Sequence, residues 1–177
     1  MSQEKLAIIE CVPQNEDKKE GLVLYEFLHT TGIDFADYFE FTNCSDLLEF
    51  LASGEVEEYA SVHLSGHGAA SGDEACFKMP RGRIHPDEFP AECFLGKTVA
   101  VSACELGRKC FADPFLATTM AAAMIAPQRE VPFIDAAVFF VNYYYHLYRQ
   151  GVRPRTAFDR TREYLNGKAL GGFQYFS

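Results

Sequence analysis

Two side chains that can act together as a nucleophile and a base follow two apolar runs of the sequence. Residues 61–68 read SVHLSGHG, and in this stretch His67 stands between two glycines. Residues 98–107 read TVAVSACELG, and here the apolar run leads to Cys104. A thiol attacks a carbonyl carbon rapidly when a nearby imidazole takes its proton, so a His–Cys pair has the parts that acyl transfer requires.

The backbone around these two residues has a second use in such chemistry. Attack on a carbonyl creates an oxyanion, which backbone N–H donors stabilise. Gly68 has no Cβ, so its backbone can approach a substrate closely, and we expect the amides of Gly68 and Cys104 to form the oxyanion hole. Spacing alone leaves a loop histidine and a buried strand-end thiol as the alternative, because isolated Cys and His signals do not transfer between families.

The rest of the chain alternates apolar runs with helical patterns. Strands are expected at 5–12, 33–41, 59–66 and 97–104, and helices at 22–32, 45–56, 113–122, 135–149 and 154–167. Such alternation predicts an α/β fold of three layers, a mostly parallel central sheet with helices on both faces. Ligands gather beyond the carboxyl ends of parallel strands, so His67 and Cys104 meet if their strands are neighbours.

Some boundaries are less clear. Ser45, Asp113 and Asp135 are the expected N-caps of their helices. Residues 122–128 (AAMIAPQ) fit either the end of a helix or a short buried strand, which periodicity does not separate. A Pro-Arg-Gly turn and a short helix start are expected within 75–89.

The two last helices carry many aromatic residues. In the helix at 135–149, one expected core face holds Ala137, Phe140, Val141, Tyr144 and Tyr148. Three further aromatic residues then either pack under the last helix or form a docking surface: Phe139, Tyr143 and Tyr145. In the last helix the residues that share a face are Ala157, Phe158, Thr161, Tyr164 and Leu165.

Length and composition limit the classes of function. A chain of 177 residues suits one domain over 1–177, and its net charge of −9 disfavours nucleic acid as a partner. No apolar stretch is long enough to span a bilayer, so we expect no membrane partner. The six cysteines form no CxxC pair, which favours free thiols in a reducing cytoplasm.

Other polar residues carry weaker signals. His63 shares a strand face with His67, as a core residue or as a neighbour of the site. Without paired spacing, Cys76, Cys93 and Cys110 are not expected to bind metal, and we expect no cofactor. Residues 68–72 (GAASG) lack the lysine of a phosphate loop.

Charged residues near the motifs are candidates for substrate binding. Asp73, Glu105 and Asp135 are acids that can face a basic substrate residue. Arg81 and Arg83 flank a glycine, and a solvated turn explains them better than a phosphate site.

The two motifs together resemble the caspase-like cysteine peptidases of clan CD, and most closely their CHAT branch. That family has an apolar strand followed by His-Gly, a small hairpin, and then an apolar run ending in Ser-Ala-Cys-Glu. Here SVHLSGHG and TVAVSACELG match in order, and the resemblance extends over 58–166 and loosely over 1–57. A Trp-Pro-type stretch common in the family is absent, because this chain has no tryptophan, so substrate preference is not carried over.

The resemblance implies a cysteine endopeptidase with a caspase-like fold. Cys104 would be the nucleophile and His67 the general acid–base, acting on a protein or peptide substrate. Because an always-active endopeptidase would damage its host, we also expect control by an activating or sensor protein and a weakly active isolated chain. The loops expected to be incompletely formed are the polar, Gly- or Pro-containing segments 69–75, 105–113 and 128–132. The alternative is a catalytically inactive caspase-like interaction module.

Overall fold

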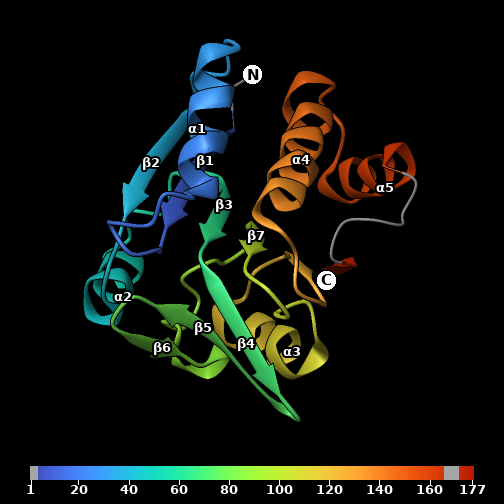
Figure 1. Ribbon diagram of the computed structural model, residues 1–177. Helices are drawn as coiled ribbons and strands as arrows, with labels where there is room; N and C mark the ends of the chain where they lie inside the picture. The colour runs from blue at the N-terminus through green and yellow to red at the C-terminus, as the bar shows by residue number, and fades with distance from the viewer. Residues whose placement is uncertain (1–3, 166–171) are drawn as a thin grey trace.

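A computed structural model describes residues 4–165 and 172–177, and a six-stranded sheet runs through its centre (Figure 1). The strand order is β2-β1-β3-β7-β8-β9. The first five of these strands are parallel, and β9 pairs with β8 in the antiparallel direction. The bounds are β1 Lys5–Glu10, β2 Ala36–Glu40, β3 Tyr59–Ser65, β7 Thr98–Ser102, β8 Ala123–Pro127 and β9 Phe173–Phe176.

A small antiparallel sheet continues directly from β3. It consists of β4 (His67–Ser71), β5 (Glu74–Met79) and β6 (Gly82–Ile84), in that order. The segment 68–72 is therefore largely a strand and not a loop. The expected turn between Pro80 and Gly82 is confirmed, and so is the helix start, as a short 3₁₀ helix at Pro86–Glu88.

Helices cover both faces of the central sheet, which confirms the expected three layers (Figure 1). Within 4–165 and 172–177, no helix is long and apolar enough to cross a membrane. On one face lie α1 (Glu20–Thr30), α4 (Phe133–Tyr144) and α5 (Pro154–Tyr164), and α4 continues into a π-helical turn at Tyr145–Arg149. On the other face lie α2 (Cys44–Ala52) and α3 (Lys109–Thr119).

The strand residues alternate between two apolar cores, one under each layer of helices. In β3, Val62 and Leu64 pack with α2 and α3, whereas His63 points to the face of α1 and α4. Because both faces are covered, every residue of β7 and β8 is buried. Polar atoms of these strands must therefore find partners inside the protein or at the ends of the strands.

Three expected helix caps are wrong. Asn43, and not Ser45, caps α2, because its extended backbone lets its Oδ1 accept a hydrogen bond of 2.9 Å from the Asp46 amide. Asp113 lies inside α3, which begins at Lys109 because the buried Phe111 brings the preceding turn onto the core. Asp135 is the third residue of α4, whose N-cap position is Pro132.

The structure also decides between the alternatives left open for residues 122–128 and for the aromatic residues of α4. Residues 123–127 are a strand. Phe139 stacks on Phe173 with ring centroids 3.9 Å apart, and it also contacts Phe158 of the last helix. Tyr143 is buried too, so these aromatic residues pack under α5 and the C-terminal strand, and Tyr145 alone of the three is exposed.

The face expected for the last helix is only partly correct. Ala157, Phe158 and Thr161 are buried. Tyr164, the last residue of the helix, is 72% exposed.

A buried carboxylate at the end of β1 gives the first prediction. Glu10 is fully buried, and burial raises the pKa of its carboxyl group. Its Oε2 accepts a hydrogen bond from the Leu22 amide, and its Oε1 has no partner among the described residues. Above its raised pKa, the folded protein therefore holds an ionised carboxylate with one unpaired oxygen.

Glu10→Gln should raise the free energy of unfolding at pH 7 by roughly 1 kcal/mol, measured by urea titration. Between the unfolded pKa, about 4.3, and the raised folded pKa, only the folded protein keeps the proton, so wild-type stability falls as pH rises through this interval. The gain should disappear as pH falls below about 4. Glu49→Gln, at an exposed position of α2, is the control. A gain for Glu10→Gln that does not change with pH would contradict this account.

Candidate functional site

The structure places His67 and Cys104 beyond the carboxyl ends of two neighbouring parallel strands. β3 pairs with β7, with Ser65 opposite Ser102. His67 follows Ser65 by two residues, and Cys104 follows Ser102 by two residues, so both leave the sheet at the same level. The condition set by the sequence, that these two strands be neighbours, is therefore met.

Two cavities open at this edge, and both residues line both cavities. The first is a wide groove of about 740 Å³, and the second is a narrow pocket of about 140 Å³. The groove is lined by Pro13, His67, Gly68, Lys78, Met79, Pro80, Cys104, Glu105, Glu130, Val131 and Pro132. The pocket is lined by Val12, Glu16, Lys18, Glu20, Ser65, Gly66, His67, Ser102, Cys104, Val131, Phe133 and Ala136.

A sharp turn after β7 presents Cys104 to these cavities. Glu105 has a φ of 67°, a left-handed conformation that is uncommon for a residue with a side chain. Its carboxylate is held by the Arg108 guanidinium at 2.5 Å and by the Ala70 amide at 3.4 Å. These contacts hold the strained turn and tie it to β4.

The sulfur of Cys104 contacts the loop between β8 and α4. The Val131 amide donates a hydrogen bond to Sγ at 3.4 Å, and the Val131 carbonyl oxygen lies 3.8 Å from the same sulfur. The thiol is half-buried between these backbone groups. An amide donor in this position suits a sulfur atom that carries negative charge during attack.

His67 is more open than Cys104. Its side chain is 58% exposed, and its Nε2 lies 3.9 Å from Oε2 of Glu16, in the loop between β1 and α1. In the described part of the chain no hydrogen bond joins the imidazole to Cys104. A catalytic pair is often loosely arranged without substrate, so this geometry is compatible with a dyad that closes on binding.

Gly68 approaches the backbone of Cys104 very closely. A Cβ atom at position 68 would lie 2.1 Å from the Cys104 carbonyl oxygen and 2.9 Å from Leu106 Cγ. The Ala70 amide turns away from β5 toward Glu105, and because antiparallel ladders alternate, the Gly68 amide also points away from β5. It therefore lies on the side of β4 that faces Cys104, as an oxyanion donor must.

His63 belongs to a buried polar network behind the site. Its Nε2 lies 2.9 Å from Glu20 Oε2, its Nδ1 lies 3.1 Å from the Tyr144 hydroxyl, and its ring packs edge-on against Phe140. It is fully buried and lines neither cavity. The core role expected for His63 is correct, and its link to the site runs through Glu20.

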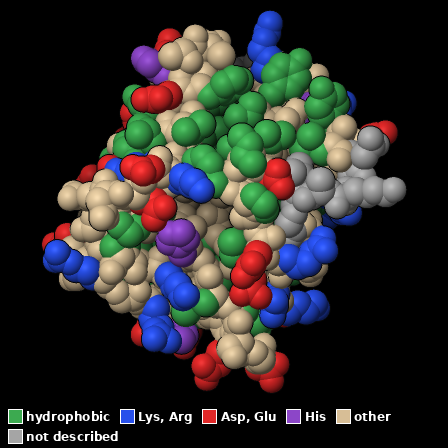
Figure 2. Space-filling view, in the orientation of Figure 1, with side chains coloured by type: hydrophobic (Ala, Val, Ile, Leu, Met, Phe, Trp, Pro, Cys, Tyr) green, Lys and Arg blue, Asp and Glu red, His purple; other side chains and the backbone are tan. Residues whose placement is uncertain are grey.

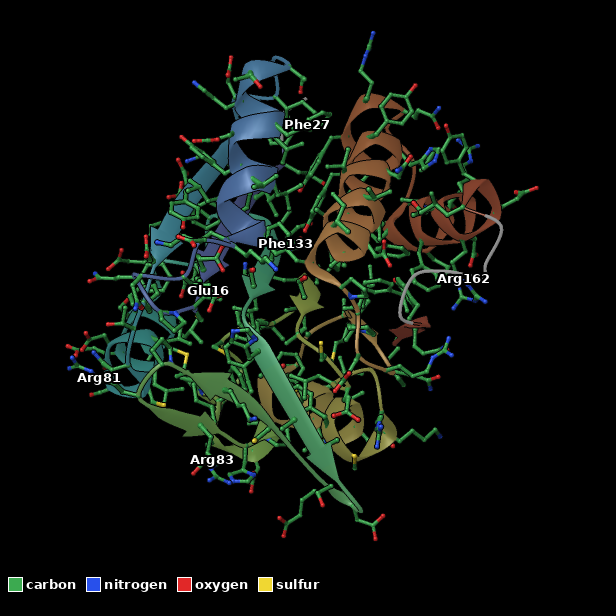
Figure 3. All side chains as sticks on the ribbon, in the orientation of Figure 1. Glu16, Phe27, Arg81, Arg83, Phe133 and Arg162 are labelled. Carbon is green, nitrogen blue, oxygen red and sulfur yellow. The ribbon has the colours of Figure 1, made fainter. Side chains whose placement is uncertain are left out.

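The three acids expected to bind substrate lie in different places. Glu105 lines the wide groove, but both of its oxygens are occupied. Asp73 lies at the tip of the β4–β5 hairpin and Asp135 in the first turn of α4, and neither lines the two cavities. Arg81 and Arg83 are exposed beside α2 and β6 (Figure 3).

The remaining cysteines do not gather around Cys104. All six are free thiols, and Cys76, Cys93 and Cys110 come from β5, a loop and α3. Among the described residues, no three His, Cys, Asp or Glu side chains form a group that could hold a metal ion.

Sequence reasoning missed Glu16, Glu20 and Val131 as parts of the site. The loop with Glu16 follows β1, which pairs with β3 so that Glu10 lies opposite Ser65. The carboxyl end of β1 therefore lies at the same edge of the sheet as His67 and Cys104. Ligands gather beyond the carboxyl ends of parallel strands, and β1 is one of these strands. The acidic residues that follow β1 could therefore have been predicted as parts of the site.

Thiol reactivity gives a prediction at this site. Burial raises the pKa of Cys93 to about 12 and that of Cys11 well above its usual range, so both should react slowly. Iodoacetamide at pH 6–7 should modify Cys104 first, as measured by peptide mass spectrometry. Cys110, which is also half-buried, is the matched comparison, and equal rates at Cys104 and Cys110 would mean that Cys104 is not activated.

Gly68→Ala should destabilise the protein by about 3 kcal/mol, because the added methyl group meets a backbone oxygen that cannot move aside. Gly72→Ala is the control. It has a φ of 59° but no atom within 4 Å of the new Cβ, so it should cost only about 1 kcal/mol. Denaturant unfolding measures both, and a Gly68→Ala protein as stable as Gly72→Ala would disprove the close approach.

Comparison with known proteins does not assign the chain to a family. A scan against protein-family models finds no match for the chain, and a search of curated proteins finds no relative.

Proposed function

We propose that this protein is a cysteine endopeptidase of the caspase-like CHAT type that hydrolyses peptide bonds with a His67–Cys104 dyad. The observation that carries the proposal is the position of the two residues beyond paired strands, where they line the same two cavities. The β4–β5 hairpin directly after His67 also corresponds to the hairpin of the family pattern.

The proposed reaction has two steps. Cys104 transfers its proton to His67 and its sulfur attacks the peptide carbonyl carbon, with the oxyanion accepting hydrogen bonds from the amides of Gly68 and Cys104. The carbon–nitrogen bond breaks, and His67 gives its proton to the leaving amine. Water, deprotonated by His67, then hydrolyses the thioester, which releases the acid and restores the thiol.

The wide groove suits an extended peptide. Its lining includes Pro13, His67, Cys104 and Pro132, and its volume exceeds that of one side chain several times. β4 is an edge strand of the small sheet, and the outward amide of Gly68 is the part of its backbone that we assign to the substrate carbonyl.

An activating or sensor protein is part of the proposal. His67 is exposed and makes no hydrogen bond to Cys104 in the described structure. A partner that binds more tightly to the form in which the two side chains meet would raise activity by that difference in affinity.

Substitutions of the dyad test the function. On a peptide library analysed by mass spectrometry, Cys104→Ala should abolish cleavage, and His67→Ala should reduce it by roughly 10²–10⁴-fold. Both proteins should keep the wild-type circular dichroism spectrum. Cys110→Ala, which removes a thiol outside both cavities, should keep most activity. Cleavage that survives in Cys104→Ala would require another nucleophile.

A non-catalytic interaction module is the second candidate, and an apolar groove favours it. The groove has a volume of about 520 Å³ and lies between α1 and α4, where Phe27 is 41% and Tyr145 48% exposed. Hydrophobic side chains gather over these helices in the upper part of Figure 2. An inert wild-type protein with an unreactive Cys104 would favour this candidate.

A further inference from the structure

The narrow pocket beside Cys104 combines apolar walls with acidic groups. Val12, Val131 and Phe133 line its sides, and Glu16 and Glu20 contribute carboxylates. Glu16 and Phe133 lie near the junction of β3 and β4 (Figure 3). A pocket of this kind suits a side chain with an aliphatic stem and a positively charged end.

Glu20 has an oxygen without a partner. Its side chain is 5% exposed, and its Oε2 lies 2.9 Å from His63 Nε2, while Oε1 makes no hydrogen bond in the described structure. Buried carboxylate oxygens nearly always have a partner, and this unpaired oxygen belongs to a residue that lines the pocket, so a donor that enters the pocket would find an acceptor close by.

The surroundings of Glu20 keep its carboxylate in place. His63, held by Tyr144 and packed on Phe140, fixes one oxygen, so the other cannot turn away to find a partner. Ser102, whose hydroxyl can accept a hydrogen bond, also lines the pocket. An ammonium or guanidinium group donates several hydrogen bonds, so it could supply a donor to the carboxylate and another to the hydroxyl.

We propose that this pocket receives a lysine or arginine side chain, that of the substrate residue whose carbonyl Cys104 attacks. The inference rests on the proposed peptidase function, because it assigns the substrate class of the same site. The pocket shares His67, Cys104 and Val131 with the wide groove, so a side chain held in it belongs to a residue next to the reacting thiol. The rest of the peptide then follows the groove.

One further charged side chain and the net charge of the protein bear on the choice. Lys18 lines the pocket too, but it is exposed and forms no ion pair within the described residues, so it can extend into solvent when a cationic side chain enters. The net charge of −9 attracts basic substrates and repels acidic ones. An aspartate in this pocket would face Glu16 and Glu20.

Peptidyl acyloxymethyl ketones that differ only in the residue next to the ketone test the proposal. The Cys104 sulfur forms a bond to the ketone methylene carbon and the carboxylate leaves, so intact-protein mass spectrometry counts the reaction. The four probes carry lysine, arginine, norleucine or aspartate, and norleucine has the stem of lysine without its charge. The lysine or arginine probe should label the wild type at least about tenfold faster than the norleucine probe does. The aspartate probe should be the slowest of the four.

Variants assign the preference to the pocket. Glu20→Gln keeps an oxygen for His63 but removes the charge, so its lysine-to-norleucine ratio should fall to within about threefold of unity. Glu10→Gln is the matched control, because Glu10 is as deeply buried but lines neither cavity, and it should keep the wild-type ratio. Lys18→Gln should keep the ratio or raise it.

The outcomes separate the two proposals. Faster labelling by norleucine or aspartate, or a ratio that Glu20→Gln leaves unchanged, overturns the basic pocket and leaves the peptidase intact. Rapid reaction of Cys104 with iodoacetamide but with none of the four probes also overturns the pocket. If iodoacetamide shows no preference for Cys104 and no probe labels it, the peptidase itself is disproved, and the pocket proposal with it.

Discussion

The parallel pairing of β3 with β7 is the constraint on which the rest of the site depends. With Ser65 opposite Ser102, the two chains leave the sheet together, and a one-residue shift of either strand would turn its side chains to the other face. The pairing also sets the backbone distance that only a glycine at position 68 allows, since any Cβ there would meet the Cys104 carbonyl oxygen. The positions of the segments that follow β3 and β7, and of the two cavities beside them, depend on this alignment.

Burial on both faces of the sheet explains where the polar groups lie. The strands are filled with apolar side chains, so carboxylates and hydroxyls collect at the carboxyl edge, where β1, β3 and β7 end. Glu10, Glu20 and Ser65 lie there at the start of α1, and the Gly21 amide donates to the Ser65 hydroxyl. Glu10 and Glu20 each keep an unpaired oxygen, which is costly in a protein interior, and of the two only Glu20 lines a cavity.

Much of the fold could be predicted from the sequence, because continuous apolar runs and helix periodicity depend on local residues. The three layers and the common edge for His67 and Cys104 agree with that alternation, whereas the order of the strands in the sheet was not predicted. The helix caps at Ser45, Asp113 and Asp135 were wrong, because tertiary packing decides which of several capable residues begins a helix. For α3, burial of Phe111 outweighed the strong Asp-Pro signal.

The pocket acids could not be assigned from sequence in the same way. Glu16 and Glu20 stand among several charged residues after β1, and nothing local distinguishes the buried Glu20 from the exposed Lys18. Only the three-dimensional contact with His63, 43 residues away, makes Glu20 part of the site. Asp73 and Glu105 were nearer to the motifs in sequence, but the hairpin carries Asp73 away from the cavities and Glu105 is used to hold its own turn.

The central claim is that His67 and Cys104 act as one chemical unit, and their coupling can be measured without a substrate. The measurement is the rate of Cys104 alkylation by iodoacetamide at pH 6 in the wild type and in His67→Ala, with Cys110 as the internal reference. We predict that Cys104 is alkylated at least about tenfold faster in the wild type than in His67→Ala. The rate at Cys110 should be equal in both proteins. Equal rates at Cys104 in the two proteins would show that the imidazole does not assist the thiol and would contradict the account.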